Sequence, residues 1–229
     1  MNSAQPSSAQ RSVRDELVHA AVALLDEHGP DALQARKVAA AAGTSTMAVY
    51  TYFGGMQALI TEVTREGLHQ FDLAQRIPTT ADPVADLLRC GLAYRRFATE
   101  HPHLYRLMFG STSAHGINVP SANVLALDVA DIDANHPSLA HLVGSVQRCL
   151  RAGRIAGDAD DDATVLAIAG QFWAMMHGFV MLELAGFFGN DGAALGSVLG
   201  GLAGNNLLAL GDRPEALQVS AAAVAAELL

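Results

Sequence analysis

Apolar residues recur at intervals of three and four positions through most of this chain, and few segments alternate apolar with polar residues. Such spacing puts the apolar side chains on one face of a helix, whereas a half-buried strand has a period of two. Alanine and leucine, which both favour helices, dominate the apolar residues. Because 51% of the 229 residues are hydrophobic, the chain can also bury a sizeable core. The sequence therefore predicts an all-α protein.

Breaks in this pattern divide the chain into segments. The predicted helices span residues 12–28, 34–41, 45–53, 56–75, 83–100, 103–109, 137–155, 162–188 and 214–228. Residues 191–210 are rich in small residues, which allow helices to approach closely. Ser12 is the expected N-cap of the first helix, and Gly29-Pro30 is expected to end it. Residues 78–83 predict a linker. Residues 110–135, which contain Gly, Ser, Pro and Asn, predict a long loop with some helix.

The formal net charge is −9, and the acidic excess lies mostly outside the N-terminal part. Residues 1–70 carry five basic and seven acidic side chains, and the chain's single lysine, Lys37, is among them. A protein that coats nucleic acid without sequence preference is normally basic, so the charge argues against that class. It does not exclude a protein that reads a specific DNA sequence.

Cys90 and Cys149 both fall in apolar helical patterns, which predicts reduced core thiols; a disulfide or a redox switch is the alternative. The histidines lack the spacing of a metal site, and no phosphate-binding loop, dinucleotide fingerprint or serine-nucleophile motif occurs. We therefore expect no enzyme activity, no cofactor and no metal. The N-terminus lacks the apolar core of a signal peptide, and a cytoplasmic location is expected.

Residues 162–188 form the most apolar predicted helix. A helix that is apolar all round is buried all round, which suggests that this one packs on its own core and on a second subunit. Gln171, His177 and Glu183 interrupt it too often for a comfortable membrane span. We expect His177 to be a core or interface residue, although a ligand contact is the alternative. A buried carboxylate is costly unless it is paired, so Glu183 is expected either to anchor a ligand or to pair with Arg95, Arg96 or Arg106.

Residues 35–56, ARKVAAAAGTSTMAVYTYFGGM, have the pattern of a helix-turn-helix. Gly43 permits the tight turn, and Thr44 or Ser45 is expected to cap the second helix with its side chain. Val49 and Phe53 are four residues apart and are expected to bury the inner face of that helix. The outer face then carries compact, hydroxyl-rich groups that can reach phosphates and base edges in a major groove. The predicted outer residues are Ser45, Thr46, Met47, Tyr50, Thr51 and Tyr52.

This segment resembles the TetR family of one-component transcriptional regulators. The matching features are the apolar pattern of the first helix and the runs Arg36-Lys37-Val38-Ala39, Ala42-Gly43 and Val49-Tyr50-Thr51-Tyr52-Phe53. The resemblance covers about residues 14–70, and the order of the later helices also fits the family. In the second half, the run Trp173-Ala174-Met175-Met176-His177-Gly178 is similar to the Trp-His-Gly (WHG) signature of one type of C-terminal domain.

The resemblance implies a homodimer with an N-terminal three-helix helix-turn-helix domain and a C-terminal helical ligand-binding and dimerisation bundle in each chain. The polar N-terminal residues 1–11 predict a disordered tail, and the resemblance implies the DNA-binding domain at 12–55, a connecting helix at 56–77 and the ligand-binding and dimerisation domain at 78–229. The implied function is repression from a palindromic operator on double-stranded DNA. A small apolar or aromatic effector is expected to release the protein.

The same resemblance suggests the site residues. The expected DNA contacts are Arg36, Lys37, Ser45, Thr46, Met47, Tyr50, Thr51 and Tyr52. The ligand pocket is expected between the helices at 83–100, 103–109, 137–155 and 162–188. Its expected lining, for which ordinary core packing is the alternative, is Tyr94, Phe97, Tyr105, Met108, Phe109, Phe172, Trp173, Met176 and His177.

The chain departs from the family just after the helix-turn-helix. Family members often carry a lysine where this chain has Gly54-Gly55-Met56, and that lysine usually binds a DNA phosphate. Met56 cannot do so, and therefore either backbone N–H groups at the start of the next helix take over or DNA binding is weaker. The alternative function is an all-α partner-binding protein with weakened DNA binding.

Overall fold

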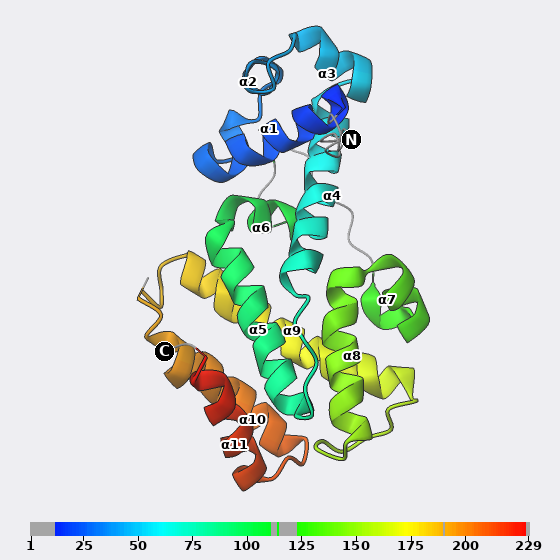
Figure 1. The fold of residues 1–229 in the computed structure, drawn as a ribbon, viewed down its shortest axis with the longest axis vertical. Helices are drawn as coiled ribbons and strands as arrows, with labels where there is room; N and C mark the ends of the chain where they lie inside the picture. Colours follow the sequence, from blue (N-terminus) through cyan, green and yellow to red (C-terminus); the bar gives the residue numbers. More distant parts are fainter. Residues whose placement is uncertain (1–11, 111–113, 115–122, 190, 228–229) are drawn as a thin grey trace, which may run out of the picture. The chain divides into compact units, whose positions relative to one another are not determined.

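The computed structural model describes residues 12–110, 114, 123–189 and 191–227. Within these residues the regular elements are helices, eleven of them α-helices (Figure 1). The predicted all-α fold is confirmed. The expected tail at 1–11 and part of the expected loop at 110–135 lie outside the described residues.

The chain divides into two compact units. The first comprises Met1–Leu68 with His103–Pro120, and the second comprises His69–Pro102 with Ser121–Leu229. Each unit thus combines two separate stretches of the chain, whereas the domains expected from the sequence are continuous stretches. The expected domain boundaries stay a prediction.

The first unit contains the three helices predicted for the DNA-binding domain, which are α1 (Val13–His28), α2 (Ala35–Ala41) and α3 (Thr46–Phe53). It also contains the short η1 (Pro30–Ala32), the first part of α4 (Met56–Ala74), expected as a connecting helix, and most of α6 (Pro102–Met108), expected in the ligand-binding domain. Ser12 caps α1 as expected, because its hydroxyl oxygen accepts a hydrogen bond from the Asp15 N–H at 3.2 Å. Leu17, Leu25 and Val49 are fully buried and form part of the core of this unit.

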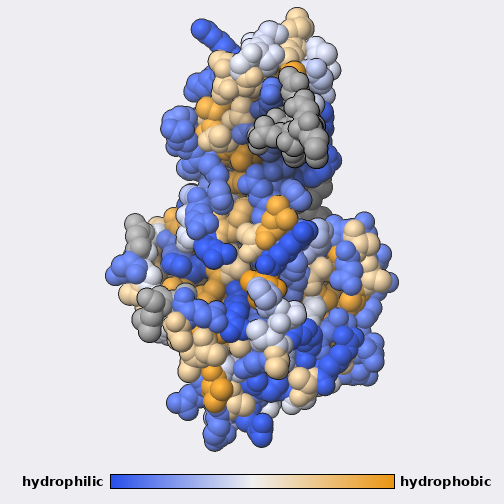
Figure 2. Space-filling model, in the orientation of Figure 1, coloured by the Kyte–Doolittle hydropathy of each residue, from blue (hydrophilic) through white to orange (hydrophobic). Residues whose placement is uncertain are grey.

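The second unit, called the body below, contains the remaining helices. They are α5 (Pro83–Glu100), η2 (Val124–Ala126), α7 (Val129–Asn135), α8 (Pro137–Arg151), α9 (Asp162–Leu184), the π-helical turn η3 (Leu195–Gly200), α10 (Gly201–Ala209) and α11 (Pro214–Ala225). Their core gathers apolar side chains from α5, α8, α9 and α10, among them Val84, Val143, Phe172 and Leu207. On the face shown in Figure 2, hydrophilic residues cover most of the surface and apolar residues form scattered patches, as expected for a folded domain.

Two predicted helices are longer in the sequence pattern than in the structure. The helix expected at 162–188 ends at Leu184, and Gly186 then adopts a φ of +85°, which turns the chain out of the helix. The helix expected at 137–155 ends at Arg151 and is followed by Gly153 with a φ of +64°. Apolar residues continue beyond both ends, and the periodic pattern cannot distinguish them from helical ones.

Helix α9 is buried on one side only within a single chain. Nine of its residues are buried, whereas a continuous stripe of mostly small residues faces outward. The stripe consists of Ala163, Ala167, Gln171, Ala174, Gly178, Leu182 and Ala185. In the described part of the chain, α9 is also the one helix whose length and composition would allow it to cross a membrane. A core helix meets the same criterion, and the buried side of α9 identifies it as such a helix.

A buried carboxylate joins three segments of the body. Asp86 on α5 accepts hydrogen bonds from the backbone N–H and the hydroxyl of Thr80, both at 2.8 Å. The Arg148 guanidinium on α8 donates to the same carboxylate at 2.6 Å. Burial by itself raises the pKa of Asp86, but the hydrogen bonds from Thr80 and Arg148 outweigh it and hold the pKa below its ordinary value.

Candidate functional site

The turn between α2 and α3 has the geometry that the sequence predicted. Gly43 adopts a φ of +65°, which glycine reaches without the strain that a Cβ atom would cause. The Thr44 N–H then donates to the Ala39 carbonyl oxygen at 2.9 Å, which closes the turn. The prediction that Gly43 makes the tight turn is confirmed.

The cap of α3 differs from the prediction. Ser45 occupies the N-cap position in extended conformation, but its side chain makes no capping hydrogen bond. The expected side-chain cap of the second helix is therefore wrong. The Ser45 side chain is exposed to solvent, and the helix is held at this end by the backbone, whose Ala48 N–H donates to the Ser45 carbonyl at 2.9 Å.

All eight predicted DNA-contacting residues are exposed. On α3, Val49 is fully buried and Phe53 is half-buried, so the inner face is the predicted one. The outer side chains include three large ones that are unusually open to solvent, namely Met47 (69% exposed), Tyr50 (53%) and Tyr52 (47%). Arg36 and Lys37 are exposed on α2. The structure thus makes these side chains available to a partner, but whether they contact DNA stays a prediction.

The helix-turn-helix is locally basic in an acidic chain. Residues 32–61 contain Arg36 and Lys37 and no aspartate or glutamate, whereas the whole chain has a net charge of −9. A polyanion that approaches α2 and α3 therefore meets two cations and no carboxylate from these helices. This local exception is visible in the sequence once the helix-turn-helix has been located.

The end of α3 is braced by a residue that sequence reasoning missed. The Arg14 guanidinium of α1 lies 5.2 Å from the centre of the Phe53 ring, within the range of a cation–π contact. The same guanidinium is 2.9 Å from the Glu62 carboxylate of α4. Arg14 therefore ties α1 to both α3 and α4. Because the three residues are far apart in the sequence, their pattern gave no signal of this contact.

The Gly54-Gly55 pair ends α3. Gly54 has a left-handed backbone with a φ of +72°, and its N–H donates to the Tyr50 carbonyl at 2.9 Å. Gly55 has a φ of +154°, which also favours glycine. Met56 is half-buried and is the first residue of α4. The glycines therefore have a structural reason to be present, and no cation follows them.

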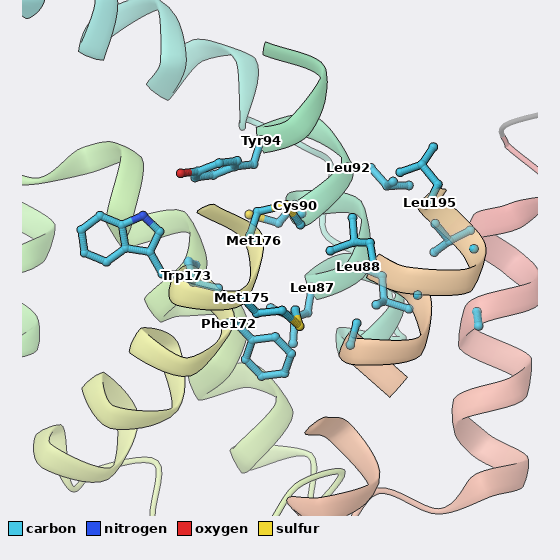
Figure 3. Close-up of a pocket in the computed structure, with 18 of the residues that line it drawn as sticks. Leu87, Leu88, Cys90, Leu92, Tyr94, Phe172, Trp173, Met175, Met176 and Leu195 are labelled. Carbon is cyan, nitrogen blue, oxygen red and sulfur yellow. The ribbon is translucent and has the colours of Figure 1, made fainter. Parts of the chain in front are cut away.

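The body contains a cavity of about 420 Å³ between α5, α9, η3 and α11. Four of the nine residues predicted to line a ligand pocket do line this cavity: Tyr94, Phe172, Trp173 and Met176 (Figure 3). His177 lies next to it, with its Nδ1 atom 3.3 Å from the Tyr94 hydroxyl. Burial lowers the pKa of His177, which favours the neutral imidazole.

The other four predicted lining residues lie elsewhere. Phe97 is buried in the body, where its ring packs on Phe71 with centroids 5.1 Å apart. Tyr105, Met108 and Phe109 belong to the first unit, in which the Tyr105 and Phe109 rings are 4.8 Å apart. None of these four borders the cavity described here. Their assignment as ligand contacts stays a prediction.

Most of the cavity wall was not anticipated from the sequence. It includes small and aliphatic residues from α5, α8, η3, α10 and α11, together with a glutamine, a cysteine and a methionine. These lining residues are Gln75, Leu87, Leu88, Cys90, Gly91, Leu92, Leu142, Met175, Leu195, Gly196, Leu199, Gly200, Ala203, Ala221, Val224 and Ala225. The glycines near residue 200 suggested close helix packing, but not that η3 would form a wall.

The cavity has a buried end and an open end. At the buried end lie Gln75, which directly follows α4, and Cys90 and Tyr94 of α5, all less than 9% exposed. Gly196 and Ala225, from η3 and α11, are exposed and mark the open side. No lining residue among those described carries a charge. Burial raises the pKa of the Cys90 thiol to about 12, because removal from water disfavours the charged thiolate.

The two cysteines are buried in the core, and Glu183 is held in an ion pair. Cys90 and Cys149 are free and buried, as predicted. Glu183 forms a two-bond ion pair with Arg95, at 2.6 and 2.8 Å, which confirms the expected pairing with one of three arginines. Glu183 is not among the residues that line the cavity.

Two family models match the chain. Residues 17–63 match the model of bacterial regulatory proteins of the tetR family, and residues 87–199 match the model of a tetracyclin repressor-like C-terminal domain. The matched segments contain α3 and most of the cavity lining. They do not specify the WHG type of C-terminal domain, which stays a prediction. No protein of curated function matches the chain.

Solved structures share the fold over nearly the whole chain. A protein of unknown function from Rhodococcus sp. RHA1 is 25% identical with a TM-score of 0.67, and the match covers 90% of this chain and 99% of that one. A candidate regulatory protein, SCO4313, is 27% identical with a TM-score of 0.56, over 86% and 94% of the two chains. RolR in complex with resorcinol is 16% identical with a TM-score of 0.54, over 91% and 92%.

Proposed function

Because this chain belongs to the TetR family of bacterial DNA-binding transcriptional regulators, which have a ligand-binding domain, we propose that it is a repressor. It binds a palindromic operator as a homodimer and leaves the operator when a small apolar or aromatic ligand binds in the body. As a regulator of transcription it acts in the cytoplasm.

The observation that carries this proposal is the outer face of α3. Tyr50 and Met47 are more than half exposed on a helix whose opposite side is anchored by the fully buried Val49. Large apolar and aromatic side chains that are exposed side by side mark a surface that binds a partner. Hydroxyl groups beside the cations Arg36 and Lys37 fit a major groove, where phosphates hold the protein in place and base edges provide specificity.

A homodimer is supported by the exposed stripe of α9. Small residues such as Ala174 and Gly178 allow two helix backbones to approach closely, and the stripe is continuous for almost the full length of the helix. Two chains joined in this way present two copies of α3. A palindrome with half-sites about 34 Å apart, one turn of DNA, would match two such copies.

A ligand site is supported by the cavity in the body. Its wall is aromatic and aliphatic, and its volume of about 420 Å³ is within the range of small-molecule sites. Resorcinol, the ligand of RolR, is a small aromatic diol. A ligand that prefers the conformation without DNA shifts the population of the protein away from the operator, and by linkage DNA weakens ligand binding.

The proposal is tested by mobility shift with the DNA upstream of the protein's own gene. We expect Arg36→Ala and Tyr50→Ala each to weaken specific binding at least tenfold while the fold and the oligomeric state are retained. If Arg36 contacts a phosphate, its loss also reduces the salt dependence of binding by about one counterion. Arg151→Ala, on an exposed arginine of α8, is the matched control and leaves the affinity unchanged.

Unchanged operator affinity in both Arg36→Ala and Tyr50→Ala would overturn the proposal that these side chains of α2 and α3 contact DNA. Absence of any shift at low salt would instead favour the second candidate function, a partner-binding protein with weakened DNA binding. Met56, which stands where many relatives have a phosphate-binding lysine, is the observation that favours this second candidate.

A further inference from the structure

Few groups in the cavity wall can form a strong hydrogen bond. Among the described lining residues, only Gln75, Cys90, Tyr94 and Trp173 have a side-chain O–H, N–H, S–H or carbonyl group. The rest are glycine, aliphatic residues, methionine and phenylalanine. A carboxamide is the most versatile of the four polar groups, because it offers two donors and an acceptor with two lone pairs.

The hydrogen bonds of Gln75 are long. Its Nε2 atom donates to the Ser138 carbonyl at 3.3 Å and to the Phe71 carbonyl at 3.4 Å. Its Oε1 atom accepts from the Cys90 thiol, with the sulfur at 3.8 Å. A thiol is a weak donor, and N–H···O bonds are usually about 2.9–3.0 Å long. The side chain is only 2% exposed, so water does not satisfy its oxygen from the surface.

A buried carbonyl oxygen that accepts one weak bond is costly, and a stronger donor would lower that cost. A hydroxyl or N–H group of a ligand at the buried end of the cavity would be such a donor. A carboxylate would meet the Gln75 oxygen and no cation there, and an ammonium group would lose its hydration without a carboxylate to replace it. The wall therefore favours a neutral ligand.

Gln75 also lies at a position from which ligand binding can affect helix α4. It directly follows α4 (Met56–Ala74), and its backbone N–H donates to the Phe71 carbonyl of that helix at 3.3 Å. Residues 56–68 of α4 belong to the unit that contains α3. The Gln75 side chain also bonds to Ser138 at the start of α8. A ligand that reorients this carboxamide thus acts on the link between α4 and α8.

We propose that Gln75 reads the polar group of the ligand, and that the ligand is a neutral, largely apolar molecule with a hydroxyl or N–H donor. This inference deepens the proposed function and rests on it, because it takes the cavity to be the effector site. It assigns chemical specificity to a residue outside the set predicted from the sequence.

The test uses three probes with one biphenyl skeleton: 4-phenylphenol, its methyl ether 4-methoxybiphenyl, and biphenyl-4-carboxylate. Trp173 lines the cavity and is the single tryptophan of the chain, so its fluorescence reports binding to the full-length protein. We expect the phenol to bind about tenfold more tightly than the ether, as one well-formed hydrogen bond allows. The carboxylate should bind at least a hundredfold more weakly than the phenol.

In Gln75→Met, which has a similar length but no hydrogen-bonding amide, the preference for the phenol over the ether should fall to less than about threefold. The affinity for the ether should change little. Gln57→Met, the same substitution at an exposed glutamine that does not line the cavity, is the matched control and keeps the preference. If Gln75→Met does not fold, Gln75→Asn, which withdraws the carboxamide by one methylene, should show the same loss.

The inference is overturned if the wild type binds phenol and ether equally, if the carboxylate binds best, or if both Gln75 variants keep the preference. Failure of the proposed function is a different result. In that case the Gln75-dependent preference is present, but the phenol does not release the protein from its operator DNA in the mobility shift. Absence of binding by all three probes would also overturn the inference, whereas the proposed function is tested separately by operator binding in the mobility shift.

Discussion

Single side chains with several partners fix much of this structure. Asp86 is 1% exposed and accepts hydrogen bonds from Thr80 and from two arginines, Arg89 and Arg148. Arg95 and Glu183 similarly join α5 to α9. In each case a buried charge is compensated by groups from other segments, and removal of one partner leaves the other charge uncompensated.

We predict that Asp86 makes the protein sensitive to acid. Its folded pKa is held below its ordinary value of about 3.9, so its contribution to stability is complete above that pH and is lost as the pH falls through the folded pKa. Asp86→Asn should lower the free energy of unfolding at pH 7 by about 3 kcal/mol. Its stability should also fall less steeply than that of the wild type between about pH 5 and pH 3.

Urea unfolding at a series of pH values measures both effects. Asp160→Asn, at an exposed carboxylate, is the control and should follow the wild-type curve. Parallel curves for wild type and Asp86→Asn would show that Asp86 has no depressed pKa.

At the scale of elements, helices with the same kind of cap residue are held in different ways. Ser12 and Ser45 both occupy N-cap positions, but only Ser12 accepts a hydrogen bond from a backbone N–H of its helix. Helix α3 is held instead by the buried Val49 and by the contact of Phe53 with Arg14. Tertiary packing therefore stabilises α3 without the local cap that its sequence offers.

We predict that Ser12→Ala lowers the free energy of unfolding by about 1 kcal/mol, because α1 loses its capping bond. Ser45→Ala should change it by less than about 0.5 kcal/mol, because no such bond is lost. If Ser45 contacts DNA as proposed, its alanine variant should weaken operator binding at nearly unchanged stability. Equal losses of stability in the two variants would show that Ser45 caps α3 in solution.

At the scale of the whole molecule, one chain leaves part of its surface unpartnered. The outward stripe of α9 includes Leu182, which is 45% exposed, beside alanine and glycine residues. Exposure of one apolar side of α9 to water is unfavourable. The same stripe of a second chain would cover that side and remove it from water. A two-fold axis at this stripe makes the contact self-complementary.

We predict that Ala174→Arg, near the middle of the stripe, separates the dimer, because a long charged side chain prevents close approach of two helices. Light scattering after size-exclusion chromatography should give the mass of one chain for this variant and of two for the wild type. Operator affinity should fall, because a single chain binds DNA with only one helix-turn-helix. Ala130→Arg, on the exposed side of α7, is the control and should remain a dimer. If Ala174→Arg also remains a dimer, the interface lies elsewhere.

Much of the turn and of the outer face of α3 could be predicted from the sequence, whereas most of the cavity wall could not. The turn at Gly43 and the buried Val49 follow from the period of the helix and from backbone sterics over a few residues. The family resemblance also indicated aromatic residues of α9 that line the cavity, among them Phe172 and Trp173. It did not indicate that η3 and α11 would form the opposite wall.

The sequence by itself determined the helical class, the order of most helices, the helix-turn-helix and the faces that can be buried. These properties depend on hydrogen bonds and side-chain spacing within one or two turns, which a linear pattern records. Only the tertiary structure decided that Glu183 pairs with Arg95 rather than with Arg96 or Arg106, that Ser45 forms no side-chain cap, and that Gln75 reaches the cavity. Each depends on the distance between residues brought together by packing, and the sequence does not encode that distance in any local pattern.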